Sequence, residues 1–223
     1  MKKLFGLLAI IVLYFSTGKS FANEGVIIIL NGPSSAGKSS IQKEIQKNSQ
    51  LHFIRIGIDT FFDALIEEPD LSNFQEEKQF HQYTSNGEYI RGVELITDED
   101  DHPIVPLYIG PAGDRIIHGM HRSISEYAKA GNNVVVDYIL YKPEWLNDLK
   151  KSLKGRKYYM VGVHAPLSVI EERELLRDTS PPGHARSHYT TVHQNFPYDL
   201  EIDTSLETPE ELAIKVLTLI NEN

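Results

Sequence analysis

Eight consecutive residues near the start of the chain match a phosphate-binding loop. Residues 32–39 read Gly-Pro-Ser-Ser-Ala-Gly-Lys-Ser, which fits the pattern G-x-x-x-x-G-K-[ST] in full. In such a loop the backbone N–H groups surround a phosphate, and glycines stand where the backbone needs a positive φ or leaves no room for a Cβ. The lysine adds a cation for the outer phosphates of a nucleotide, and the last hydroxyl ligates Mg²⁺. The pattern predicts a site for ATP and Mg²⁺, and a plain glycine-rich turn is the alternative.

The loop and the residue that follows it supply the expected nucleotide contacts. An apolar run precedes the loop and a helical pattern follows it, which is the context that the motif requires. Lys38 is expected to act on the phosphoryl group that is transferred. The residues expected to bind the nucleotide are Gly32, Pro33, Ser34, Ser35, Ala36, Gly37, Lys38, Ser39 and Ser40.

Two aspartates follow apolar segments that are typical of strands. Asp59 ends the run 51–58, and Asp137 ends a run of three valines. Ligands of open α/β sheets lie beyond the carboxyl ends of the strands. Asp59 is therefore a candidate general base for an attacking hydroxyl, with Asp63 one helical turn further on; a helix N-cap explains Asp59 equally well. Asp137 is expected to hold Mg²⁺ together with Ser39.

Three arginines flank a segment rich in proline and glycine. Arg173, Arg177 and Arg186 bracket residues 178–184, which read Asp-Thr-Ser-Pro-Pro-Gly-His. Arginine suits a lid over phosphates, because its planar fork binds two oxygens and stays charged. The lid is the favoured interpretation for Arg173 and Arg177. For Arg186 it is balanced against a solvent-exposed helix in which neighbouring glutamates pair with the arginines.

The wider pattern of the chain alternates strands and helices. This alternation predicts a three-layer α/β fold with a mainly parallel five-stranded sheet. The expected strands cover 26–30, 51–58, 133–137, 158–163 and 198–202. The expected helices cover 38–48, 114–130, 143–153, 166–177 and 208–221. The last of these begins with Thr-Pro-Glu-Glu, a capping box with proline at the first helical position.

Residues of about 66–109 interrupt this alternation. Segments 89–96 and 104–109 flank an acidic stretch at 98–103, which is typical of a hairpin with a solvent-exposed turn. We interpret this stretch as a small insertion that lies over one edge of the core.

Composition excludes several other classes of protein. The 22 Lys and Arg residues against 31 Asp and Glu give a formal charge of −9, so nucleic acid is not an expected partner. There is no cysteine, which excludes a disulfide framework and a thiolate nucleophile. The nine histidines show no zinc-binding spacing. His118 and His121 lie three residues apart on one expected helix and are expected at the surface or in a pocket lining.

Residues 1–22 have the layout of a secretory signal peptide. Two lysines precede an apolar run from Leu4 to Phe15, and Ser20-Phe21-Ala22 provides small residues for cleavage. The run is shorter than the roughly 20 residues that span a bilayer. We therefore predict an exported protein whose folded domain covers 23–223, with no stable membrane span after cleavage; an uncleaved N-terminal anchor is the alternative.

Taken in order, several sequence blocks resemble the chloramphenicol phosphotransferase-like family. They are the phosphate loop, G-I-D-T-F-F-D-A-L at 57–65, A-G-N-N-V-V-V-D at 130–137, G-V-H-A-P-L-S-V-I-E-E-R-E at 162–174, P-P-G-H-A-R at 181–186 and Y-D-L-E-I-D-T-S at 198–205. The resemblance implies a small P-loop kinase that transfers the γ-phosphate of ATP to a hydroxyl, as the antibiotic resistance enzymes of the family do. It also implies nucleotide binding at 32–39, a general base at Asp59 and lid roles for Arg173 and Arg177.

The sequence leaves three functions open. The first is an ATP- and Mg²⁺-dependent kinase that phosphorylates a hydroxyl of a small molecule, and it is the one we favour. The second is an exported nucleotide-binding interaction module without catalysis. It is motivated by the signal peptide and by Ser180, which stands where the family's lid often carries another arginine. The third is a kinase whose acceptor is a nucleotide sugar. The oligomeric state is left open.

Overall fold

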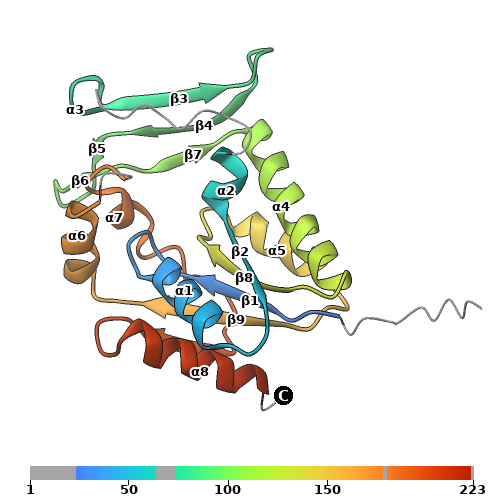
Figure 1. Cartoon of the computed structure of the whole chain (residues 1–223). Helices are drawn as coiled ribbons and strands as arrows, with labels where there is room; N and C mark the ends of the chain where they lie inside the picture. The colour runs from blue at the N-terminus through green and yellow to red at the C-terminus, as the bar shows by residue number, and fades with distance from the viewer. Residues whose placement is uncertain (1–23, 64–73, 178–179, 222–223) are drawn as a thin grey trace, which may run out of the picture.

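The computed structural model describes residues 24–63, 74–177 and 180–221 (Figure 1). The predicted signal peptide at 1–22 lies outside these residues. A five-stranded sheet forms the centre, in the order β10-β9-β1-β8-β2, and every neighbouring pair is parallel. Its strands are β1 (Ile27–Asn31), β2 (Phe53–Gly57), β8 (Asn133–Tyr138), β9 (Tyr158–His164) and β10 (Leu200–Asp203).

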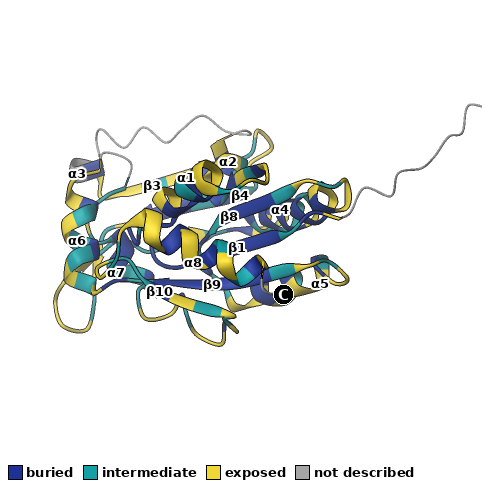
Figure 2. Ribbon diagram, turned by 60° about the horizontal axis from the view of Figure 1, so that its bottom comes forward, coloured by how far each residue is buried: buried dark blue, intermediate teal, exposed yellow. Residues whose placement is uncertain are grey.

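Helices cover both faces of this sheet, which makes the three layers (Figures 1 and 2). One face packs against α4 (Pro111–Lys129) and α5 (Pro143–Ser152). The other packs against α1 (Lys38–Asn48), α6 (Leu167–Leu175) and α8 (Pro209–Asn221). Both faces of β1 are buried, which explains why its sequence is continuously apolar rather than alternating. The predicted fold class is confirmed.

The two-residue period of β8 decides where its polar residues point. Val134, Val136 and Tyr138 belong to the core on the α4 and α5 side, whereas Val135 belongs to the core on the α1 side. Asp137 shares the orientation of Val135, because side chains two apart in a strand lie on the same face. The carboxylate of Asp137 is thereby directed toward the start of α1, where the phosphate loop ends.

All five predicted core strands and the five predicted helices are present, with shifted ends. The strand expected at 51–58 is shorter because α2 (Ile58–Asp63) begins at its last residue. The helix expected at 114–130 begins earlier, since Pro111 provides its first turn. The capping box of α8 is formed: the Glu211 N–H donates to Thr208 Oγ1 at 3.3 Å, and the Thr208 N–H donates to Glu211 Oε2 at 2.9 Å.

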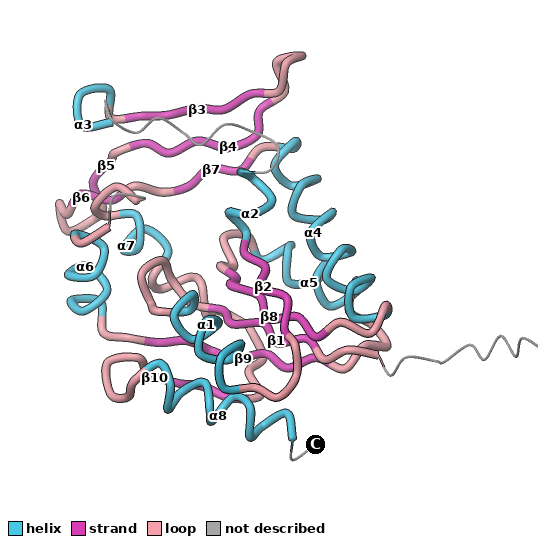
Figure 3. The backbone as a smooth tube through the Cα atoms, viewed as in Figure 1, coloured by secondary structure: helices cyan, strands magenta, loops and turns pink. Residues whose placement is uncertain are grey.

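The insertion forms a three-stranded antiparallel sheet above the central one, and a separate two-stranded sheet (Figure 3). The predicted hairpin is confirmed, since β4 (Tyr89–Glu94) pairs with β7 (Leu107–Ile109), and short strands β5 (Ile96–Thr97) and β6 (Pro103–Ile104) extend it. The sequence analysis missed β3 (Gln79–Tyr83), which completes this sheet, and the short α3 (Phe74–Glu77). The expected boundary near 66 lies outside the described residues. The insertion contributes to a cavity at the carboxyl ends of β2 and β8, so it covers more than one edge.

One expectation for the histidines is wrong. His121 is fully buried rather than at the surface or in a pocket lining. Its Nδ1 donates to Asp148 Oδ2 at 2.8 Å, and its Nε2 accepts from the Tyr138 hydroxyl at 3.0 Å. This arrangement needs one ring nitrogen as donor and the other as acceptor, so it fits the neutral ring.

Within the described residues, no helix combines the length and the apolar character needed to cross a bilayer.

We expect the buried His121 to make stability depend on pH. Burial lowers the pKa of His121 to about 4. Between pH 6.5 and 4 the unfolded chain binds a proton that the folded chain does not, so stability falls as the pH falls, by up to about 3 kcal/mol from this group. Urea unfolding of His121→Gln should show a smaller decrease over this range, whereas His118→Gln should keep the original dependence. An unchanged pH dependence in His121→Gln would contradict this assignment.

Candidate active site

The phosphate loop connects β1 to α1 at the carboxyl edge of the sheet. Gly37 has a φ of +93°, a backbone conformation that residues with a Cβ rarely adopt, and α1 starts at the next residue. Gly32 packs so closely on β9 that a Cβ there would lie 2.3 Å from the carbonyl oxygen of Val163. Both glycines of the motif are therefore required by geometry. The positive end of α1 lies at this loop and favours an anion there, as the sequence predicts.

Lys38 lies at the mouth of this loop. Its Nζ donates to the carbonyl oxygens of Gly32, at 2.9 Å, and Pro33, at 2.7 Å, and lies 3.4 Å from Asp137 Oδ1. Burial lowers the pKa of the Lys38 ammonium and raises that of Asp137, and each charge offsets the shift of the other. The structure thus brings the lysine of the loop and the aspartate of β8 together.

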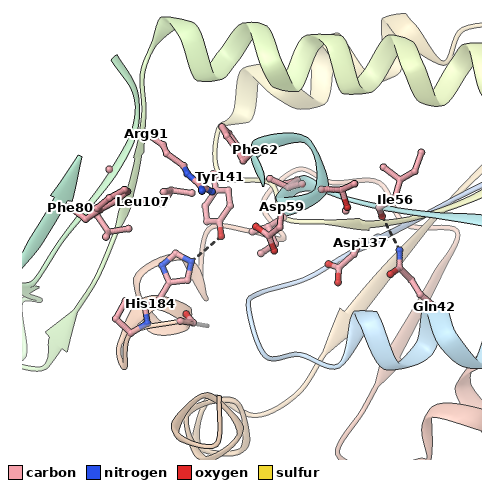
Figure 4. Close-up of a pocket in the computed structure, with 18 of the residues that line it drawn as sticks. Gln42, Ile56, Asp59, Phe62, Phe80, Arg91, Leu107, Asp137, Tyr141 and His184 are labelled. Atoms are coloured by element: carbon pink, nitrogen blue, oxygen red, sulfur yellow. Dashed lines mark hydrogen bonds between the residues drawn. The ribbon is translucent and has the colours of Figure 1, made fainter. Parts of the chain in front are cut away.

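Asp59 and Asp137 open onto one cavity of about 400 Å³ (Figure 4). Gly57 at the end of β2 pairs with Asp137 on β8, and Asp59 follows two residues later. The negative charge of Asp59 acts on both Lys38 and Asp137, because the three groups are neighbours. Phe62, Val93, Leu107 and Ile139 provide apolar walls for this cavity. A small organic molecule fits a cavity of this size and lining.

The two alternatives for Asp59 are now distinguishable. Asp59 is the second residue of α2, inside the helix rather than at its N-cap. Its side chain is exposed and lines the cavity, as a general base must. Asp63 does not line this cavity; its Oδ1 lies 3.7 Å from Nη2 of Arg91.

A second cavity, also of about 400 Å³, lies on the other side of the loop. Arg173 donates from Nη1 to Oγ1 of Thr204, at 2.7 Å, and from Nη2 to the Thr204 carbonyl, at 2.8 Å. The Thr204 hydroxyl also donates to the carbonyl oxygen of Ala36, at 2.9 Å, so it ties Arg173 to the phosphate loop. This cavity has room for the rest of a nucleotide whose phosphates enter the loop. Its lining residues are Ser35, Gly37, Ser39, Ser40, Ile41, Arg173, Arg177, Thr204 and Pro209.

The two oxygen donors expected for Mg²⁺ line different cavities. Ser39 lines the second cavity, and Asp137 lines the cavity onto which Asp59 opens. A hydroxyl and a carboxylate are the hard ligands that Mg²⁺ binds, with phosphate oxygens and waters completing its shell. The chemistry of this donor set fits the ion. Among the described residues there is no group of three or more His, Cys, Asp or Glu side chains that could hold a metal by themselves.

The arginines of the expected lid divide into two groups. Arg177 lies beside the loop, with Nη1 3.5 Å from Oγ of Ser35, and its positive charge acts on Lys38 and Asp137. Arg186 instead pairs with Glu171, from Nε at 2.7 Å and from Nη2 at 2.6 Å. Arg173 and Arg177 therefore border the nucleotide site, and Arg186 is a member of a partly exposed ion pair.

Glu174 holds residues 183–185, at the described end of the expected lid. Its two carboxylate oxygens accept from the backbone N–H groups of Gly183 and Ala185, both at 2.8 Å. These residues lead into the short helix α7 (His184–His188). Burial raises the pKa of Glu174, although both N–H groups favour the charged form. In the alternative to the lid, a solvent-exposed helix, the neighbouring glutamates pair with the arginines; Glu174 instead binds two backbone N–H groups.

Replacing Glu174 should loosen the lid. In Glu174→Gln only one side-chain oxygen remains, so one of the two N–H groups faces an amide NH₂. A buried donor without an acceptor costs about 1–3 kcal/mol. We expect about tenfold faster hydrogen exchange at the Gly183 or Ala185 amide, since 1.4 kcal/mol corresponds to that factor. The exposed neighbour Glu172, changed to Gln, is the control; equal exchange in both variants would refute the anchor.

Three residues that the sequence did not promote also shape the site. The Tyr141 hydroxyl donates to His184 Nε2 at 3.0 Å, and His184 Nδ1 donates to the carbonyl oxygen of Val105 in the insertion at 2.9 Å. His188 Nε2 accepts from the backbone N–H of Ser34 at 3.1 Å. Burial lowers the pKa of both histidines, which keeps them neutral in these roles. Helix α7 thus links the insertion, the cavity onto which Asp59 opens and the phosphate loop.

The geometry defines a protein with the P-loop kinase fold, and solved structures agree. An APS kinase of Mycobacterium tuberculosis, solved with AMPPNP and APS, superimposes with a TM-score of 0.57 at 17% identity, covering 89% of this chain and 98% of that one. A gluconokinase of Sinorhizobium meliloti gives a TM-score of 0.54 at 16% identity, covering 90% and 93%. At these identities the likeness concerns the fold.

Sequence comparison identifies the family. Residues 25–221 match the family described as "Chloramphenicol phosphotransferase-like protein". The "Putative O-phosphotransferase Rv2636" of Mycobacterium tuberculosis (strain H37Rv) is 36% identical over 191 residues, which is 85% of this chain and 80% of the relative. The chain belongs to the chloramphenicol phosphotransferase-like family. Family and fold together support phosphotransferase activity.

Proposed function

We propose that the protein transfers the γ-phosphoryl group of ATP to a hydroxyl of a small molecule. The observation that carries this proposal is the position of Asp59. Its carboxylate lines a cavity shared with Asp137 at the mouth of the phosphate loop, and its negative charge acts on Lys38. A carboxylate there is placed to receive the proton of an alcohol that enters the cavity.

In this reaction the loop amides and Lys38 hold the β- and γ-phosphates. The acceptor oxygen forms a bond to the γ-phosphorus while the bond from that phosphorus to the β-phosphate oxygen breaks, and ADP leaves with the bonding electrons. The hydroxyl proton passes to Asp59. Arg173 and Arg177 close over the nucleotide, and their charges offset the negative charge of the phosphates. Mg²⁺, held by Ser39 and Asp137, would neutralise charge on the phosphate oxygens.

The test is a transfer assay with a broad acceptor panel. The protein from residue 23 onward is incubated with γ-labelled ATP, Mg²⁺ and hydroxylated antibiotics, sugars, nucleotide sugars and metabolites. We expect label on an alcohol oxygen of at least one acceptor, identified by product mass spectrometry. Tight ATP binding without transfer to any acceptor would favour the nucleotide-binding module over the kinase.

A further inference from the structure

Arg91 reaches from the insertion into the cavity onto which Asp59 opens, which is the proposed acceptor cavity. It lies on β4, and its side chain is only 11% exposed. Nε donates to Oε1 of Gln82 at 2.6 Å, and the guanidinium lies 4.7 Å from the centre of the Phe62 ring. Figure 4 shows the side chain pointing from the insertion toward Tyr141. A hydrogen bond and a ring contact thus fix the plane of the guanidinium before any ligand arrives.

The terminal nitrogens of Arg91 are left available. Among the described residues, neither Nη donates a hydrogen bond, and the nearest carboxylate oxygen, on Asp63, is 3.7 Å from Nη2. A guanidinium that served only to fix β4 to α2 would use these nitrogens on protein oxygens, because a desolvated cation without hydrogen bonds is costly. The paired Nη edge is the part of arginine that binds carboxylate or phosphate oxygens two at a time.

The other charged groups of the cavity already have roles. Asp137 lies beside Lys38, and Asp59 is the candidate base. His184 is a neutral acceptor for Tyr141. Arg55 also lines the cavity but is exposed, so solvent screens its charge. Arg91 is the lining cation that is both largely buried and fixed in orientation.

We infer that the acceptor is a hydroxylated molecule with an acidic group, a carboxylate or a phosphate, which the Nη edge of Arg91 binds while the hydroxyl faces Asp59. This inference rests on the proposed function and adds the substrate class. Both ends of the acceptor lie in the one cavity of about 400 Å³, so the acid and the hydroxyl belong to the same small molecule. Neutral analogues of the same shape would offer the Nη edge of Arg91 no charged acceptor.

Matched acceptor pairs test the inference by transfer. The panel contains hydroxylated carboxylates, their primary amides and hydroxylated phosphate monoesters. We expect transfer mainly to the acidic members, and the carboxylate and phosphate arms show which group is preferred. For the best acceptor, Arg91→Gln should raise KM about tenfold or more with kcat little changed, and Arg91→Lys should restore part of the affinity. Arg122→Gln, at an exposed position of α4, is the matched control.

Binding without chemistry separates this inference from the proposed function. Calorimetry with hydroxymethylbenzoate and its amide is run on the Asp59→Asn protein with ADP filling the phosphate loop. The acid site is supported if the carboxylate binds more tightly than the amide and if Arg91→Gln removes this difference. This result would support it even if no acceptor is ever phosphorylated. Preferred transfer to neutral acceptors, or equal binding of acid and amide in proteins with and without Arg91, would overturn the inference while the kinase stands.

Discussion

Asp59→Asn should lower kcat by about 10²- to 10⁴-fold, the usual contribution of a general base. The asparagine keeps the shape of the side chain and removes its ability to take the proton of the acceptor. ATP binding should change little, because the nucleotide contacts come from the loop and the second cavity. The measurement is steady-state transfer to the best acceptor, with ATP affinity from calorimetry.

The control makes the same change one helical turn away. Asp63→Asn alters a carboxylate at the end of α2 that does not line the acceptor cavity. It should keep kcat close to that of the unmodified protein. An Asp59→Asn enzyme with unreduced kcat would remove Asp59 from the chemistry, and an equal loss in both variants would point to α2 as a whole.

Replacing Lys38 should lower kcat by a comparable factor, because the site loses a positive charge. In Lys38→Met the phosphoryl group loses its buried cation, and preorganised charges of this kind contribute about 10²- to 10³-fold to kcat. The variant also leaves Asp137 without the ammonium that lies 3.4 Å away, so we expect the pKa of Asp137 to rise further and the fold to lose stability. Transfer rate and urea unfolding measure the two effects.

A double variant separates the two roles of Lys38. In Lys38→Met with Asp137→Asn the uncompensated carboxylate is gone, so stability should return while activity stays low. Lys43→Met, on the exposed face of the same helix, should affect neither. Activity that returned with stability would mean that Lys38 acts only by keeping the fold.

The sequence predicted most of the nucleotide site because that site is local. The phosphate loop lies within eight consecutive residues, and the flanking strand and helix are visible as an apolar run and a helical pattern. The run of three valines placed Asp137 at the carboxyl end of a predicted strand, and the structure places it beside Lys38.

The acceptor side depends on strand order, which no local pattern shows. Asp59 meets Asp137 only because β2 pairs with β8, two strands separated by the whole insertion. Arg91 enters the cavity only because the insertion folds across the carboxyl ends, and β3, which supplies Gln82 beside it, was missed. His121 was misplaced because its partners Tyr138 and Asp148 come from two other elements.

The most direct test is a crystal structure with Mg²⁺ and a non-hydrolysable ATP analogue. An acceptor oxygen lies about 3 Å from its base and about 3–3.5 Å from the phosphorus that it attacks. We therefore predict that the γ-phosphorus lies within about 6 Å of an Asp59 carboxylate oxygen. The space between these two atoms should open onto the acceptor cavity, which Arg91 lines. A triphosphate bound outside the loop, or an Asp59 carboxylate separated from the γ-phosphate by protein, would contradict the account.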